Sequence, residues 1–396
     1  MTTLNRITAA LALTLAATLP MGAAAQGKEA LKLGVVTSQT GVFQAFGEDL
    51  LRGVQFAVDE ANANGGVAGR PVQVQIADDE GTPDAGRRAA ERLANGGHNL
   101  LIGPISSAVS LAIAPNLERW DAIYVATNSK SDRINGDACK ARMFRTIQSD
   151  AMDLAIVRPW LEKEKEKRFG IIAGDYVWGR GAAEAFTKAA TSLGRKVEVT
   201  VYPPLGTKDF APYISQLKTA GTEGVFVALT GRDQIAFVKQ AEEFGLSKSV
   251  RIIGLNYLLE FALKATGTSM EGAWGNINYN ASIQTARNQQ FVDAWRKKYN
   301  RDPSEMEGGA YTGATTIFQG VQKAGSVKPA DVAKALRGAS LETVFGTVTM
   351  RAQDNQLQIP NYFGIAKLVN GQLRSSVTQT FDTKTVTVPA SADCKL

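Results

Sequence analysis

The chain has 396 residues, of which 44% are hydrophobic and 21% charged, the composition of an ordinary globular protein of two or three domains. One histidine and two cysteines are too few for a zinc site of several such ligands, and the lone His98 gives little scope for a catalytic serine–histidine pair. The net charge of +6 is mild for this length. We therefore expect no metal, no cofactor and no nucleic-acid partner.

Residues 1–25 are typical of a secretory signal peptide. The segment has a short basic start from Met1 to Arg6, continues as an apolar run over 7–19, and ends in the small-residue cleavage pattern of Ala23 to Ala25. The apolar run is too short to span a bilayer. The sequence therefore predicts an exported protein that is not anchored in the membrane.

From residue 31 onward, predicted strands alternate with predicted helices. A buried strand at 31–37 is followed by a loop at 38–47 and by a helix that ends at Gly65 and Gly66. The strand at 72–76 alternates apolar and polar residues. The next expected elements are a helix near 84–95, a strand at 100–103, a helix near 107–119 and a strand at 122–126.

The same order repeats in the second half of the chain. We expect strands at 169–173, 196–202, 224–229 and 251–254, with helices at 182–192, 210–219 and 233–244. Beyond residue 270 the pattern is less regular, with helices near 285–299, 310–324 and 329–338 and strands at 344–350, 364–369 and 381–387. This alternation predicts two α/β lobes with parallel central sheets.

Ligands of open parallel sheets bind beyond the carboxyl ends of the strands. This rule selects six loops, three from each half: 38–46, 103–107, 127–131, 175–181, 230–233 and 255–258. If the two sets face each other, they form a cleft suited to a small molecule.

Two serines at the start of the helix after residue 106 have two possible roles. Ser106 or Ser107 is a helix cap, or the hydroxyls receive an anionic group such as a carboxylate. Thr127 and Ser129, in the neighbouring loop, add further hydroxyls. No catalytic acid–base pair is evident, so we expect a binding protein rather than an enzyme.

Cys139 and Cys394 are the only cysteines. An oxidising compartment favours a disulfide between them, and two unrelated thiols are the alternative.

Several motifs together indicate a family. They are the T-G-x5-G loop of 40–47, the glycine-to-asparagine helix of 53–62, Asp78 and Asp79, and the later segments LIGPISSAVSLAIAP, FRTIQSD, GDYVWGRG, KDFAPYISQLK and VFGTVTM. The chain resembles, over nearly its whole exported length, the Leu/Ile/Val-binding type of periplasmic binding protein of ABC importers.

The resemblance implies two Rossmann-like lobes joined by a hinge of three crossovers, with residues 26–147 and 277–352 in the first lobe and 148–276 and 353–396 in the second. It also implies a periplasmic monomer that binds a small molecule, catalyses nothing and delivers its ligand to a membrane permease. A ligand-sensing receptor of the same fold, feeding a signalling partner, is the alternative. The first crossover would lie near Cys139, with Cys394 returning toward the hinge.

The resemblance also implies a ligand site. It places Ser106, Ser107, Thr127 and Ser129 at the ligand carboxylate; the other implied positions are Phe43, Phe46 and Trp178 as walls, with Thr230, Asn256 and Tyr257 in the remaining loops of the second lobe.

One position departs from the family. Amino-acid binders commonly carry an acid in the loop after the strand RIIG, where it pairs with the α-ammonium, and this chain has Asn256 there. Asp175 or Asp233 is a possible substitute, whereas Lys130 and Arg232 favour a negative ligand. We expect an aromatic or other organic carboxylate without an amino group, with a branched-chain-type amino acid, an amide or a urea-like compound as alternatives.

Overall fold

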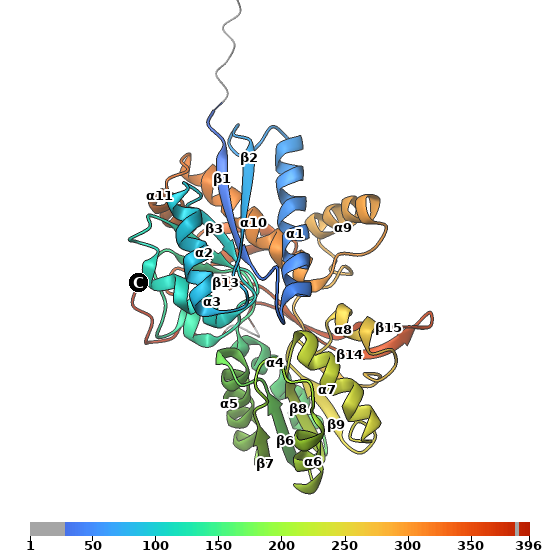
Figure 1. The fold of residues 1–396 in the computed structure, drawn as a ribbon. Coiled ribbons are helices and arrows are strands. Elements are labelled where there is room, and N and C mark those ends of the chain that lie inside the picture. Colours follow the sequence, from blue (N-terminus) through green and yellow to red (C-terminus); the bar gives the residue numbers. More distant parts are fainter. Residues whose placement is uncertain (1–27, 385–387) are drawn as a thin grey trace, which may run out of the picture.

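The computed structural model describes residues 28–384 and 388–396, and Figure 1 shows two lobes, one above the other. The predicted signal peptide lies outside the described residues. None of the helices among the described residues is long and apolar enough to cross a membrane.

The first lobe is built on a parallel sheet of five strands in the order β2-β1-β3-β4-β5. The strands are β1 (Leu31–Thr37), β2 (Val72–Asp78), β3 (Leu100–Gly103), β4 (Ile123–Ala126) and β5 (Met143–Arg145). The helices of this lobe are α1 (Gln44–Ala63), α2 (Pro83–Asn95), α3 (Ser107–Ile113), α9 (Ala286–Tyr299), α10 (Glu305–Ala324) and α11 (Pro329–Leu336). Late helices thus complete a lobe that early strands begin (Figure 1).

Two glycines allow α1 to sit close to its neighbours. A Cβ atom on Gly47 would lie 1.7 Å from the carbonyl oxygen of Ser38, and one on Gly53 would lie 2.4 Å from that of Glu307 in α10. The apolar side of α1, which includes Leu50 and Val54, is buried against the sheet and α10. The first loop is thereby held tightly between the sheet and α1.

The helix expected over 107–119 is shorter in the structure. α3 ends at Ile113, and a 3₁₀ turn (Ala114–Asn116) follows. Pro115 lies in this turn and has no backbone N–H to donate, so it cannot continue the α-helical hydrogen bonds.

The second lobe contains a mixed sheet of seven strands in the order β15-β14-β10-β9-β8-β6-β7. β6 to β10 are parallel, while β14 and β15 form an antiparallel edge. The strands are β6 (Arg168–Ala173), β7 (Lys196–Val201), β8 (Gly224–Ala228), β9 (Arg251–Gly254), β10 (Trp274–Ile277), β14 (Asn361–Val369) and β15 (Gln372–Phe381). The helices are α4 (Asp150–Lys163), α5 (Val177–Ser192), α6 (Ala211–Thr219), α7 (Gly231–Glu243) and α8 (Glu260–Ala265).

The last predicted strand, 381–387, is misplaced. The chain turns back at Asn370 and Gly371, both with positive φ, and pairs immediately as β15. A two-residue Asn-Gly connection is a strong signal for a β-hairpin. Residues 385–387 are outside the described part of the chain.

Three segments connect the lobes: one between β5 and α4, one between β10 and α9, and one between β13 (Leu357–Gln358) and β14. β13 belongs to a small sheet with β11 (Ser340–Thr343) and β12 (Gly346–Met350). Gln148 donates to the carbonyl oxygen of Pro360 at 2.7 Å, so the first and third segments are hydrogen-bonded to each other. The predicted two-lobe fold with three crossovers is confirmed, and we retain the predicted residue limits of the lobes as a proposal.

A disulfide joins Cys139 to Cys394, with Cα atoms 5.5 Å apart, as predicted. The tail is also held by a hydrogen bond from Arg351 to the carbonyl oxygen of Val388. The end of the chain therefore lies beside the first lobe (Figure 1), although the predicted limits assign it to the second.

We predict that Cys139→Ser combined with Cys394→Ser lowers stability without affecting the interlobe cavity. A crosslink over 255 residues restricts the unfolded chain, which is typically worth about 2–4 kcal/mol. For a chain of this size, the melting temperature should fall by about 3–5 °C. Differential scanning calorimetry checks this, and an unchanged melting temperature would contradict it.

Candidate functional site

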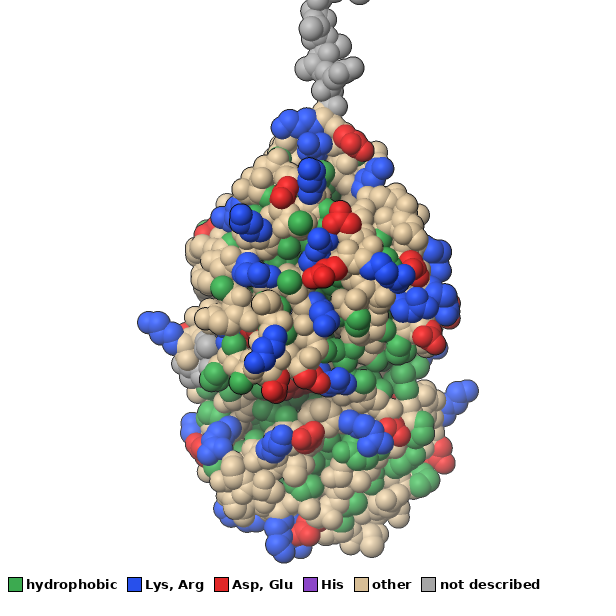
Figure 2. All heavy atoms as spheres, turned by 90° about the vertical axis from the view of Figure 1, so that its left-hand side faces the viewer, with side chains coloured by type: hydrophobic (Ala, Val, Ile, Leu, Met, Phe, Trp, Pro, Cys, Tyr) green, Lys and Arg blue, Asp and Glu red, His purple; other side chains and the backbone are tan. Residues whose placement is uncertain are grey.

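A small cavity lies between the lobes, with about 350 Å3 of empty space including its mouth. Residues of both lobes line it: Phe43, Phe46, Ile105, Ser106, Ser107, Asn128, Tyr176, Trp178, Thr230, Asn256 and Met306. Seven of the ten ligand-site residues predicted from the sequence are among them. Figure 2 shows the seam between the two lobes from outside, bordered by apolar and charged side chains.

The lobes are closed on this cavity. The ring of Phe46 in α1 meets that of Phe261 in α8 edge-on, with centroids 4.6 Å apart. Phe43 meets Tyr176 in the same manner, at 6.1 Å. Each pair joins the first lobe to the second, so the aromatic side chains of both lobes close the cavity together.

Asp78 and Asp79 at the end of β2 shape the first loop. The carboxylate of Asp78 accepts the backbone N–H of Gln39 and the hydroxyl of Thr40, and Asp79 accepts the hydroxyl of Ser38. Burial raises the pKa of Asp79 to about 6. These bonds fix the loop that carries Phe43 over the cavity.

The two serines at the start of α3 have different surroundings. Ser107 Oγ accepts the backbone N–H groups of Lys130 and Ser131, both at 3.2 Å, and so ties the loop after β4 to α3. Ser106 is the N-cap residue, but its side chain makes no capping bond. Within the described residues its hydroxyl has no hydrogen-bond partner, which leaves it available to a ligand.

Three predicted residues do not line the cavity. Thr127 Oγ1 accepts from Asn128, and Ser129 Oγ is bonded to Ser110 and to the carbonyl oxygen of Pro104. Tyr257 is buried inside the second lobe, beneath Gly254. The ligand contacts expected of these three residues remain predictions, and their side chains are directed elsewhere.

Four cavity residues were missed by sequence reasoning. Ile105, Asn128 and Tyr176 lie in the loops selected by the strand-end rule, so their position was available as a signal. Met306 comes from the start of α10, which no strand-end rule selects. The hydroxyl of Tyr176 and Oδ1 of Asn128 are buried and have no partner among the described residues. Buried polar atoms without a partner are exceptional in a folded protein.

Trp178 is held in place from behind. Its indole N–H donates to Oδ1 of Asp150, the first residue of α4, at 2.8 Å. Burial raises the pKa of Asp150 to about 8, with a further contribution from the nearby carboxylate of Asp132. Asp150 is therefore largely protonated at neutral pH.

Asn256 lies two residues beyond the end of β9 and has a φ of +49°, a left-handed conformation that asparagine tolerates better than most residues. Its Oδ1 accepts from Asn278 at 2.9 Å and from the buried ammonium of Lys130 at 3.3 Å. Lys130 is also ion-paired with Asp153 and lies behind the cavity wall.

Neither acid proposed as a partner for an ammonium reaches the cavity. Asp175 is exposed and pairs with Arg180, and Asp233 accepts the backbone N–H of Gly206. None of the cavity residues is charged.

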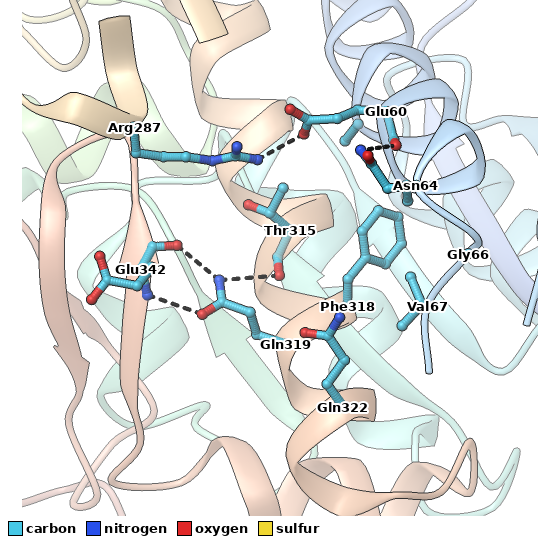
Figure 3. Close-up of a pocket in the computed structure, with 12 residues that line it drawn as sticks. Glu60, Asn64, Gly66, Val67, Arg287, Thr315, Phe318, Gln319, Gln322 and Glu342 are labelled. Carbon is cyan, nitrogen blue, oxygen red and sulfur yellow. Dashed lines mark hydrogen bonds and ion pairs between the residues drawn. The ribbon is translucent and has the colours of Figure 1, made fainter. Parts of the chain in front are cut away.

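Larger hollows occur elsewhere, and one of about 940 Å3 lies on the first lobe between α1 and α10 (Figure 3). There Arg287 pairs with Glu60, and Gln319 is hydrogen-bonded to the backbone of Glu342. The side chains around this hollow have no buried polar atom left without a partner in the described chain. The interlobe cavity is therefore the better candidate.

We predict that Asp150→Asn flattens the pH dependence of stability. The folded protein keeps the Asp150 proton up to about pH 8, whereas the unfolded chain releases it near 3.8, so the free energy of unfolding falls as pH rises through this window. The variant keeps an acceptor for Trp178 but cannot ionise, and should remove up to about 1.4 kcal/mol per pH unit from the slope. Urea unfolding between pH 5 and 8 measures it, and a slope equal to that of the unchanged protein would contradict the prediction.

Comparison with known proteins places the chain in a family. The family model described as periplasmic binding protein matches residues 30–372. The chain is 29% identical to Leu/Ile/Val-binding protein homolog 3 of Brucella melitensis, covering 87% of this chain and 92% of that one. It is 28% identical to the leucine-, isoleucine-, valine-, threonine- and alanine-binding protein of Pseudomonas aeruginosa, covering 87% and 91%.

Solved structures show the same fold. The solute-binding protein of an ABC transporter from Rhodopseudomonas palustris BisB5, in complex with 3,4-dihydroxybenzoic acid, superposes with a TM-score of 0.82 at 24% identity, covering 90% of this chain and 98% of that one. The chain thus belongs to the periplasmic binding protein family, whose members are binding proteins of the periplasm and not enzymes.

Proposed function

We propose that this protein is the substrate-binding component of an ABC importer and that it captures a small aromatic or other organic carboxylate without an amino group. The observation that carries the proposal is the lining of the cavity: aromatic walls, several hydrogen-bond donors and no acidic side chain. The signal peptide and delivery to a membrane permease are parts of the same proposal.

An amino acid fits this lining poorly. Its α-ammonium would be buried between the lobes without a carboxylate partner, and burying an unpaired charge is costly. Asp175 and Asp233 have other partners and do not line the cavity. The position where family members carry the acid is Asn256, whose oxygen already faces Lys130.

A carboxylate finds neutral donors instead. The hydroxyls of Ser106 and Thr230 and the amide of Asn256 belong to the lining, and the Lys130 ammonium lies directly behind Asn256. Hydrogen bonds to a charged acceptor are stronger than those between neutral groups. The rings of Phe43 and Trp178 supply flat apolar surface for the rest of the ligand.

The relatives support both amino acids and aromatic acids as ligand classes, and the cavity lining favours aromatic acids. The Pseudomonas aeruginosa relative is named for binding aliphatic amino acids, while the Rhodopseudomonas palustris structure holds a dihydroxybenzoic acid. The lining of the cavity, which has aromatic rings and no acidic side chain, fits the aromatic acid better than an amino acid.

We expect a thermal-shift screen of residues 26–396 to respond to benzoate or 4-hydroxybenzoate and not to L-leucine. A ligand at about 100 times its Kd stabilises the folded state by about 2.7 kcal/mol, and the melting temperature should rise by about 3 °C. A response confined to amino acids would contradict the proposed ligand class.

We predict that Ser106→Ala weakens benzoate binding about tenfold. The change removes one hydrogen bond to a charged acceptor, worth about 1.5 kcal/mol, without opening a large void. Isothermal titration calorimetry measures the effect. Ser326→Ala, in the turn between α10 and α11, is the matched control and should bind as the unchanged protein does. Equal affinity of all three proteins would remove Ser106 from the site.

A further inference from the structure

Three buried asparagines behind the cavity form a directed chain of hydrogen bonds. The backbone N–H of Asn256 donates to Oδ1 of Asn276 at 2.8 Å. Nδ2 of Asn276 donates to Oδ1 of Asn278 at 3.0 Å, and Nδ2 of Asn278 donates to Oδ1 of Asn256 at 2.9 Å. We call Asn276, Asn278 and Asn256 the amide relay.

The direction of the relay follows from its first bond. A backbone N–H can only donate, so the atom of Asn276 that faces it must be the oxygen, and each later amide is oriented by the one before it.

The Lys130 ammonium reinforces this direction. Its Nζ lies 2.7 Å from Oδ1 of Asn278 and 3.3 Å from Oδ1 of Asn256, and it is ion-paired with Asp153. An ammonium has donors only. If the amide of Asn256 were reversed, its nitrogen would face two donors, Lys130 and Asn278, with no acceptor between them.

The outward atom of Asn256 is therefore a nitrogen. Its Oδ1 is bonded inside the relay, and Nδ2 has no partner among the described residues while the residue lines the cavity. We propose that the amide relay, held by Lys130, fixes this wall of the cavity as a hydrogen-bond donor and so makes the site select an acceptor group and reject an ammonium or an amide NH2.

The inference rests on the proposed function. It assigns the selection of ligand charge to Lys130 and the three residues of the amide relay, of which only Asn256 lines the cavity. Lys130, Asn276 and Asn278 are positioning residues: they are almost fully buried and act through Asn256. The relay joins the end of β9 to the end of β10, and Lys130 reaches it from the first lobe.

The test compares benzoate with benzamide, which has the same ring and nearly the same size but carries an NH2 in place of one oxygen. The quantity measured by isothermal titration calorimetry at pH 7.5 is the ratio of the Kd for benzamide to the Kd for benzoate. We expect a ratio of at least ten in the unchanged protein. A purely structural defect would weaken both ligands equally and leave the ratio unchanged.

Two isosteric variants address the relay. Asn256→Asp keeps an acceptor toward Lys130 and Asn278 but puts an oxygen toward the cavity, and should lower the ratio at least tenfold. Asn276→Asp, away from the cavity, removes the donor that orients Asn278 and should lower the ratio severalfold. Asn116→Asp, which makes the same exchange of atoms in the 3₁₀ turn after α3, is the control and should leave the ratio unchanged.

The outcomes separate the two proposals. If the unchanged protein binds no organic carboxylate, the proposed function fails. If it binds benzoate and the ratio in Asn256→Asp stays as in the unchanged protein, or both affinities fall by one factor, the relay is overturned while the proposed function stands. Asn256→Asp keeps every inward hydrogen bond of the relay. If Asn276→Asp proves too unstable to assay, the ratio of the two Kd values in Asn256→Asp alone decides whether the relay selects the ligand.

Discussion

The buried ammonium of Lys130 is the interaction on which the centre of this molecule depends. It extends from the loop after β4 in the first lobe to Asp153 in α4 of the second, and both side chains are at most 1% exposed. Removing one partner of such a pair leaves an uncompensated buried charge, at a typical cost of about 3–5 kcal/mol. The remaining donors of the ammonium orient Asn278 and Asn256. This charge thus joins the lobes near the hinge and, together with Glu305, which accepts from Nδ2 of Asn278 at 2.7 Å, orients the amides behind the cavity wall.

Around this fixed centre, the two lobes each supply one part of the binding site. The first contributes the serines of α3 and the phenylalanines near α1, and the second contributes Tyr176, Trp178 and Asn256. The contacts of Phe43 with Tyr176 and of Phe46 with Phe261 form across the seam between lobes. A ligand that touches both sides binds the closed arrangement better than an open one and shifts the population toward it, as in hinge closure generally.

The alternation of strands and helices predicted the fold and the loops at the strand ends, while the family resemblance supplied the individual site residues, seven of which line the cavity. The strand-end rule located the loops, but it could not decide which side chains in a loop face the cavity. In the loop after β4, Asn128 lines the cavity, while Thr127 and Ser129 on either side are bonded within the first lobe. In the loop after β9, Asn256 lines the cavity and Tyr257 does not. Neither loop is a regular strand, and Asn256 has a left-handed backbone, so no simple period in the sequence predicts which side chain faces the cavity. Met306 comes from α10, which is distant in sequence from the strand-end loops. The Asn370–Gly371 turn is a local sequence signal that predicts the hairpin of β14 and β15.

The absence of charge from the cavity lining has a consequence for transport. A carboxylate in a dry site could be held by a direct ion pair with Lys or Arg, but breaking a buried pair is slow and costly, and differences in affinity are expressed mainly in the rate of release. Here the positive charge of Lys130 is already paired with Asp153 and acts on the cavity only through the amide of Asn256. When the lobes separate, the proposed ligand loses hydrogen bonds to neutral groups, which water can replace. In the proposed function, the site thereby selects the charge of its ligand without holding the ligand by an ion pair.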